Sequence, residues 1–386
     1  MTFLDEQLLE QIHSRADHYD RENSFPEEDF EALREAGYLG AFVPKEFGGA
    51  GLSLEEIANC QRQLAKASPA TALSINMHQI IVGVARYAYR HGNENAAQIL
   101  KDAAAGELFA FGISEPGNDL VLFGSISEVT PTKDGGFAFS GLKIFVSMAP
   151  AWTRLFTFGR DDSGGPDGDE GPRSVFAVLH REDGGFEMKN DWDTMGMRAT
   201  QSNSIVLQGA TASPDRVLTR TEPGPSTDPV VFGIFANFEI LLAATYTGIG
   251  ERAVEVAVEH VKTRRSVMNQ TTYDKDPAIR WRLASAALTM NSVWPQIAEL
   301  ARDFDADVDR GDWWMPQLSA VKNVASEATL RAVEQAVRSS GGSSYYSKHE
   351  LSRLYRDAVA GLFQPSDQES LHQSWANMLL GPIDDS

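Results

Sequence analysis

The spacing of hydrophobic residues changes twice along the chain and so divides it into three regions. In residues 1–110 apolar side chains recur every three or four positions, which is the period of amphipathic helices. Leu8, Ile12 and Ala16 form one such stripe, and residues 53–56 (SLEE) have the form of a capping box that opens a helix. We therefore expect an N-terminal all-α domain.

Between residues 111 and 222 the period falls towards two, which is typical of β-strands. Two segments that contain Asp-Gly-Gly, residues 133–136 and 182–185, are expected to form hairpin turns between strands. This pattern predicts a middle domain that is an antiparallel β-barrel or β-sandwich.

From residue 223 the helical period returns and continues to the end of the chain. We expect four helical segments, at about residues 230–266, 277–308, 315–339 and 348–380. Four long amphipathic helices with short connections predict an up-down four-helix bundle. The predicted fold class is therefore α+β multidomain, with domains at residues 1–110, 111–222 and 223–386.

Composition narrows the classes of function. The chain has 386 residues, with 34 Lys and Arg against 54 Asp and Glu, and a formal net charge of −20. This acidity argues against a nucleic-acid-binding protein, because phosphate neutralisation needs a basic surface. The single cysteine, Cys60, excludes an intrachain disulfide and a metal site made of several thiolates. We see no signal peptide and no apolar run of about 18 residues, so we expect a cytoplasmic protein without membrane contact.

Four motifs follow one another along the chain. They are Phe25-Pro26 with residues 37–40 (GYLG) and 43–49 (VPKEFGG); residues 111–119 (FGISEPGND) with 141–147 (GLKIFVS); residues 195–200 (MGMRAT); and Gly341-Gly342 followed by Arg356-Asp357-Ala358. Together with the α–β–α order, these motifs make the chain similar to the acyl-CoA dehydrogenase flavoprotein superfamily over nearly its whole length.

The resemblance implies a flavin site between the second pair of motifs. By matching position, Phe111, Ile113 and Ser114 would hydrogen-bond the pyrimidine edge of the flavin ring. Phe145 would pack on the ring, and Ser147 would bond near its N5 atom. These residue types suit a flavin, since an aromatic ring shields one face and short hydroxyls tune the ring without adding charge.

The resemblance also implies FAD shared between subunits. Arg264 matches an arginine that binds the FAD pyrophosphate of a neighbouring subunit, and Gly342 would let that neighbour's adenosine approach closely. The family's aromatic residue in this region is Val267 here, and residues 272–277 hold no counterpart of its glutamine. We expect FAD, a homo-oligomer (dimer or tetramer), an acyl-CoA or related acyl thioester as substrate, and electron-transfer flavoprotein or oxygen as acceptor.

A dehydrogenase of this family needs a base that removes a proton from the thioester α-carbon while hydride passes to the flavin. That base must lie within hydrogen-bond reach of the proton. In the commonest family pattern it is a glutamate nine residues after the arginine that Arg356 matches, and this position is Pro365 here. Proline cannot act as a base.

A second family pattern places the glutamate ten residues before a helical glycine. Counting back from Gly248 gives Phe238, with Glu239 next to it, although one residue turns ~100° around a helix. We therefore rank Glu239 first as the catalytic base, Asp367 second and His372 third.

The substrate is expected to lie against residues 70–77 and the start of the bundle, with Phe235 and Phe238 as binding residues. An acyl-CoA dehydrogenase is the first interpretation. A flavin-dependent monooxygenase or oxidase of the same fold is an alternative, because it does not need the glutamate. A non-catalytic relative that binds flavin or acyl thioester is the third.

Overall fold

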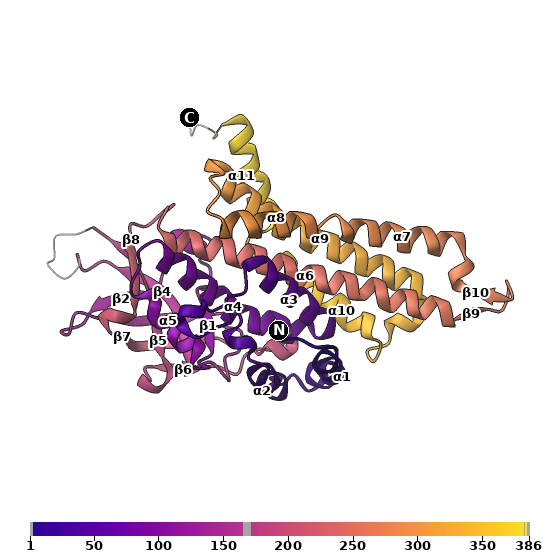
Figure 1. Ribbon diagram of the computed structural model, residues 1–386, viewed down its shortest axis with the longest axis horizontal. Helices are drawn as coiled ribbons and strands as arrows, with labels where there is room; N and C mark the ends of the chain where they lie inside the picture. Colours follow the sequence, from indigo (N-terminus) through magenta and orange to yellow (C-terminus); the bar gives the residue numbers. More distant parts are fainter. Residues whose placement is uncertain (1–2, 165–170, 382, 384–386) are drawn as a thin grey trace.

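The computed structural model describes residues 3–164, 171–381 and 383, and its elements follow in the order helices, sheet, helices (Figure 1). The N-terminal helices are α1 (Glu6–Glu22), α2 (Glu27–Glu35), α3 (Leu54–Ala67), α4 (Pro69–Arg90) and α5 (Ala96–Ala104). Ser53 caps α3 as predicted: its side chain accepts from the Glu56 backbone, and the Glu56 carboxylate accepts from the Ser53 backbone. The helical N-terminal region is therefore confirmed.

The middle region is a mixed β-sheet. Its strands are β1 (Phe109–Gly112), β2 (Glu128–Pro131), β3 (Phe137–Lys143), β4 (Arg154–Asp161), β5 (Arg173–His180), β6 (Phe186–Met188), β7 (Ile205–Ala212) and β8 (Val217–Thr221). They lie in the order β6-β7-β3-β2-β4-β5-β8, and β1 pairs with β4 in parallel. The predicted turn at 133–136 joins β2 to β3. The predicted hairpin at 182–185 is wrong, because β5 pairs with β4 and β8 whereas β6 pairs with β7.

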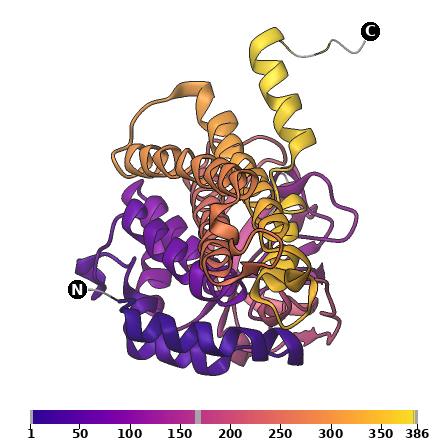
Figure 2. The same cartoon turned by 90° about the vertical axis from the view of Figure 1, so that its right-hand side faces the viewer.

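The C-terminal region is helical, as predicted, but two of its predicted helices are broken. Its helices are α6 (Pro229–Thr263), α7 (Pro277–Asn291), α8 (Trp294–Asp305), α9 (Trp314–Ser340), α10 (Glu350–Val359) and α11 (Gln368–Leu380). The segment 277–308 divides just before Pro295, which lies in the first turn of α8, where proline fits. The segment 348–380 divides at residues 360–367, and α11 projects away from the bundle (Figure 2).

Helix α6 connects the regions, since it packs against α3, α4 and α9. Gly248 permits the close crossing with α3, because a Cβ there would lie 2.2 Å from the carbonyl oxygen of Arg62. Contrary to the expectation that no apolar run is long enough to cross a membrane, α6 has sufficient length and hydropathy. However, 83% of its most apolar window is buried inside the protein, so α6 is packed as a core helix.

Candidate functional site

A cavity of about 520 Å³ lies where the sheet, α4, α6 and the segment after α10 meet. This volume is within the range of small-molecule sites. Apolar side chains from all three regions form much of its wall: Leu73, Met77, Phe111, Ile113, Leu122, Phe145, Met197, Ile234, Phe235, Phe238 and Phe363. The cavity is thus built only when the three regions pack together.

The residues predicted to hold the flavin ring all line this cavity: Phe111, Ile113, Ser114, Phe145 and Ser147. Phe111 lies near the end of β1, and the parallel pairing with β4 fixes its position. The Ile144 backbone N–H donates to the Ser114 carbonyl at 2.9 Å, which joins the two motifs. The structure therefore brings together the two segments that the resemblance placed under a flavin.

Phe145 presents an aromatic face inside the cavity. Phe145 lines this apolar wall, and 60% of the residue is exposed to solvent. Its φ of +57° is uncommon for a residue of this size, and the ring meets Trp192 edge to face at a centroid distance of 6.1 Å. A ring held in this way is a stacking platform for a planar ligand, so the residues present fit a flavin. The sequence analysis missed Trp192, although it stands three residues before the motif at 195–200.

A chain of hydroxyl groups continues along the same wall. Ser147 Oγ lies 2.8 Å from Ser202 Oγ, which lies 2.7 Å from Thr200 Oγ1. Thr200 Oγ1 is also 2.8 Å from the Met197 carbonyl oxygen. Ser147 is thus positioned by a polar network that carries no formal charge.

Glu115 lines the cavity and forms a buried ion pair with Lys143, with an Oε1–Nζ distance of 2.6 Å. Burial raises the pKa of Glu115, but Lys143 and the hydroxyls of Ser125 and Ser127 outweigh it and lower that pKa to about 2. Because Glu115 is ionised and its oxygens accept several hydrogen bonds, it anchors the loop that follows it rather than acting as a base. Sequence reasoning missed this pair, although each partner stands in one of the quoted motifs.

Glu239 is the candidate base that lies in the cavity wall. Its side chain is buried on α6, and Ser366 Oγ donates to its Oε1 at 2.8 Å. Among the described residues, its Oε2 has no hydrogen-bond partner. Burial raises the pKa of Glu239, while the charge of Lys322 and the bond from Ser366 oppose that rise.

The other two candidates lie elsewhere. Asp367 caps α11, where its carboxylate accepts from the Ser370 backbone at 2.8 Å, and hydrogen bonding to Ser370 lowers its pKa. His372 is exposed on α11, and its ring lies 2.6 Å from the Gln368 carbonyl oxygen. Neither residue belongs to the described lining of the cavity, whereas Pro365 does. Asp367 is thus placed as a helix cap.

The motifs at 195–200 and 356–358 meet in another part of the cavity wall. The Met197 backbone N–H donates to Asp357 Oδ1 at 2.6 Å, and burial raises the pKa of Asp357 to about 6. Gly196 packs directly on the backbone of α10, because a Cβ there would lie 2.1 Å from the Arg356 carbonyl oxygen. This contact fixes the segment that carries Met195 and Met197 into the cavity.

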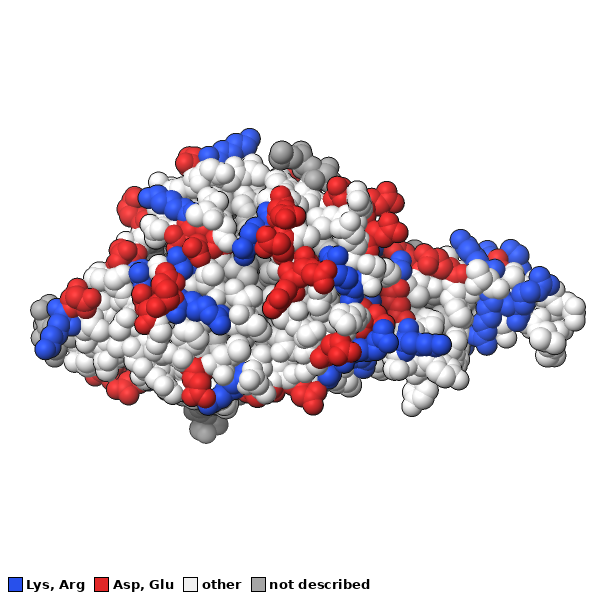
Figure 3. All heavy atoms as spheres, turned by 90° about the horizontal axis from the view of Figure 1, so that it is seen from below, with Lys and Arg blue, Asp and Glu red and all other residues white. Residues whose placement is uncertain are grey.

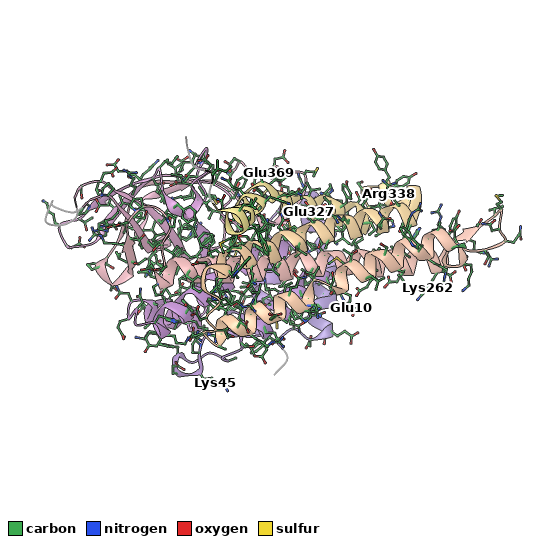
Figure 4. The ribbon with its side chains drawn as sticks, turned by 90° about the horizontal axis from the view of Figure 1, so that it is seen from above. Glu10, Lys45, Lys262, Glu327, Arg338 and Glu369 are labelled. Atoms are coloured by element: carbon green, nitrogen blue, oxygen red, sulfur yellow. The ribbon has the colours of Figure 1, made fainter. Side chains whose placement is uncertain are left out.

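Arg264 and Gly342 lie far from the cavity of their own chain. Arg264 follows the end of α6, about 38 Å along that helix from Phe238. Its guanidinium donates to the Ser340 carbonyl at 2.6 Å and lies 4.4 Å from the Tyr273 ring centroid. Lys and Arg gather at this end of an otherwise acidic protein (Figure 3), where Figure 4 labels Lys262 and Arg338.

Two family models match the chain: the acyl-CoA dehydrogenase N-terminal domain at residues 3–107 and the acyl-CoA dehydrogenase C-terminal domain at residues 240–363. An L-evernosamine nitrososynthase from Micromonospora sp. is 30% identical over 368 residues, which cover 92% of this chain and 84% of the relative. A dibenzothiophene monooxygenase from Rhodococcus qingshengii is 24% identical, with 91% and 86% covered.

A solved structure of KijD3 in complex with FMN and dTDP-3-amino-2,3,6-trideoxy-4-keto-3-methyl-D-glucose superposes with a TM-score of 0.86. It is 27% identical, and the match covers 98% of this chain and 93% of that chain. The family models, the relatives and the cavity agree with the motifs in the sequence. The chain therefore belongs to the acyl-CoA dehydrogenase superfamily and is a flavin-dependent enzyme of that fold.

Proposed function

We propose that this enzyme is a flavin-dependent monooxygenase that transfers one oxygen atom of dioxygen to a heteroatom of a compact substrate, while the other oxygen leaves as water. The observation that carries the proposal is the cavity wall at residues 363–365, where Pro365 replaces the usual glutamate base. The two named relatives, a nitrososynthase and a dibenzothiophene monooxygenase, support it. The preferred function is thus the alternative of the sequence analysis rather than its first interpretation.

The flavin would be held by Phe145 against one face of its ring, by Ser147 near N5, and by Phe111, Ile113 and Ser114 along the pyrimidine edge. When bound, the flavin supplies the electrons and the site at which dioxygen is activated. Ser147, fixed by its hydroxyl neighbours, can exchange a hydrogen bond with the ring near N5 without adding charge.

The remaining wall excludes water and orients the substrate. Ile234, Phe235 and Phe238 give α6 an apolar face towards the cavity, and Phe363 adds a ring from the segment after α10. Water exclusion strengthens polar contacts inside the site and prevents side reactions. Glu239, whose pKa burial raises, can take a proton from a substrate group that reaches its free oxygen.

The test is isotopic. The enzyme is loaded with FAD or FMN, supplied with NADH and a separate flavin reductase, and given small primary amines and aromatic sulfides under ¹⁸O₂. We expect ¹⁸O in a product by mass spectrometry, with none formed without oxygen. Rapid reoxidation of flavin with no labelled product from the whole panel would refute the monooxygenase.

A specific observation favours a second candidate, the acyl-CoA dehydrogenase. Glu239 lines the cavity, its buried Oε2 has no hydrogen-bond partner in the described part of the chain, and burial raises its pKa, which supports a role as the base for α-proton abstraction. If it has this role, acyl-CoA thioesters bleach the bound flavin under anaerobic conditions, Glu239→Gln abolishes the bleaching, and electron-transfer flavoprotein or oxygen takes the electrons. Neither bleaching nor labelled product is expected of a non-catalytic binder.

We also propose that the cofactor is FAD and that the enzyme is a homo-oligomer, with Arg264 and Gly342 of one copy serving the flavin of its neighbour. The distance of Arg264 from the cavity of its own chain and the basic character of that end support this arrangement. Chromatography of the flavin released by heat, together with light scattering of the assembled enzyme, tests it. Release of FMN alone would contradict the FAD assignment. A cytoplasmic location remains a prediction.

A further inference from the structure

Helix α9 packs against the wall segment, residues 361–366, which follows α10 and contributes to the cavity wall. Lys322 and Ser326 lie one turn apart on α9, so they share the face that meets this segment. A Cβ at Gly361 would lie 2.9 Å from Ser326 Oγ, so the backbone of the wall segment lies directly against α9 at this point. Lys322 is thus placed within reach of that backbone.

Lys322 is buried, and the wall segment uses its whole ammonium group. Lys322 Nζ donates to the carbonyl oxygens of Gly361 at 2.8 Å, Gln364 at 2.5 Å and Ser366 at 3.2 Å. An ammonium group has three N–H donors and no acceptor, so these three carbonyls satisfy it. The carbonyls of a chain that has just left a helix lack partners within that helix, so a cation is favourable there. Lys322 therefore gathers three points of the wall segment around one atom.

Ser366 links Lys322 to Glu239. The Ser366 carbonyl accepts from Lys322, while the Ser366 hydroxyl donates to Glu239 Oε1 at 2.8 Å. Ser319 Oγ, also on α9, lies 2.9 Å from the same hydroxyl. Burial raises the pKa of Glu239, and the charge of Lys322 opposes that rise. Burial lowers the pKa of Lys322, and the carboxylates of Glu239 and Asp367 oppose that fall.

We propose that Lys322 is a positioning residue of the active site: its ammonium group folds the wall segment into the cavity wall and places Ser366 on Glu239. The wall segment carries Phe363 and Pro365, so its position sets the space that a substrate meets there. The positive charge also lets the buried Glu239 exist as a carboxylate that can accept a proton. Without that charge, burial would keep the side chain as a neutral acid, which cannot act as a base.

Lys322→Met and Lys322→Gln separate the hydrogen bonds of Lys322 from its charge. The two new side chains have equal length and no charge, but only glutamine offers N–H donors to the carbonyls. Hydrogen exchange of peptides that cover the wall segment, measured by mass spectrometry on the flavin-loaded enzyme, reports how often the segment opens. We expect exchange to be about ten-fold faster or more in Lys322→Met, with a smaller increase in Lys322→Gln and no change in α4.

Infrared difference spectra recorded across pH report the ionisation of Glu239, through the band of the protonated carboxyl that Glu239→Gln removes. In both Lys322 variants this band should persist to a pH at least about one unit higher than in the wild type, because both lack the positive charge. Arg331→Met is the matched control, since it removes an exposed cation from the same helix and should change neither measurement.

Two results would overturn the proposal. One is a Glu239 band that titrates in the variants as it does in the wild type. The other is exchange in Lys322→Met that stays at the wild-type rate in the wall segment or rises equally along the whole chain, as for a lysine that only stabilises the fold. If Lys322→Met does not fold, Lys322→Gln carries the test, because its Glu239 band must still shift.

The inference rests on the proposed function for its use of Glu239 as a proton acceptor, but neither measurement needs turnover. An absence of ¹⁸O product would therefore refute the monooxygenase and leave the positioning role of Lys322 standing. Wild-type exchange and an unshifted Glu239 band would refute the positioning role even if labelled product forms.

Discussion

The buried ion pair of Glu115 and Lys143 at the cavity wall predicts a large loss of stability when one partner is removed and a smaller loss when both are removed. Lys143 and Glu115 have no exposed side-chain surface, and Lys143→Met would remove the cation that opposes the effect of burial on the Glu115 carboxylate. Losing one member of a buried pair costs about 3–5 kcal/mol. Glu115 keeps donors from Ser125, Ser127 and Asn118, so we expect the low end, about 3 kcal/mol.

The double variant distinguishes the interaction between Glu115 and Lys143 from the interactions of each residue with its surroundings. In Glu115→Gln/Lys143→Met no buried charge remains, so the loss of stability should be smaller than the sum of the two single losses. Burial lowers the pKa of Lys143 to about 8 although Glu115 opposes that fall, so the site as a whole disfavours the ammonium form relative to water. We therefore expect the pair to position the loop at residues 115–127 more than it stabilises the fold.

Calorimetric melting of the flavin-loaded variants at equal protein and flavin concentrations measures these effects. A loss of about 3 kcal/mol corresponds to a fall in melting temperature of roughly 4 °C at neutral pH for a chain of 386 residues. The pKa of Glu115 is about 2 in the folded protein, so its contribution is present above pH ~4.5 and is lost as pH falls through 2. A Lys143→Met variant that melts like the wild type, or single losses that add in the double variant, would refute the reasoning.

Three further outcomes are expected. Asp357→Asn should gain stability relative to the wild type as pH rises from 4 to 7, by up to about 3 kcal/mol. Burial raises the pKa of Asp357 to about 6, so its stabilising contribution is present below pH ~3.8 and lost as pH rises through 6; melting temperatures across this range check the sign. Gly196→Ala should weaken flavin binding several-fold by fluorescence titration, since its Cβ would collide with the Arg356 carbonyl, whereas Gly40→Ala meets nothing within 4 Å and should not. Arg264→Glu should lower the flavin retained by the assembled enzyme after gel filtration, and Arg331→Glu, exposed on α9, should not; equal retention in both would count against the role of Arg264.

The parts of the fold that the sequence predicted well depend on local patterns, and the errors depend on contacts between distant segments. The capping box at Ser53 and the turn at 133–136 follow from a few adjacent residues. The pairing of β6 with β7 does not, because a short strand carries no local information about its partner. Lys322 is the clearest case in the site: it lies within a helical pattern on α9, and only the folded chain shows it bound to three carbonyls beside Glu239.

Glu239 lines the cavity although it is one residue beyond the position that the family pattern gives. One residue beyond Phe238 is a turn of ~100° around α6. However, Phe235 also lines the cavity, and Phe238 and Glu239 are its i+3 and i+4 neighbours, which share one helix face. Phe235, one helical turn before Glu239, therefore indicates better than the adjacent Phe238 which way the Glu239 side chain faces. The cavity contacts both neighbours, so the carboxylate lies beside the aromatic wall. Ser366 fixes one of its oxygens, and the other has no hydrogen-bond partner within the ranges that the structure describes.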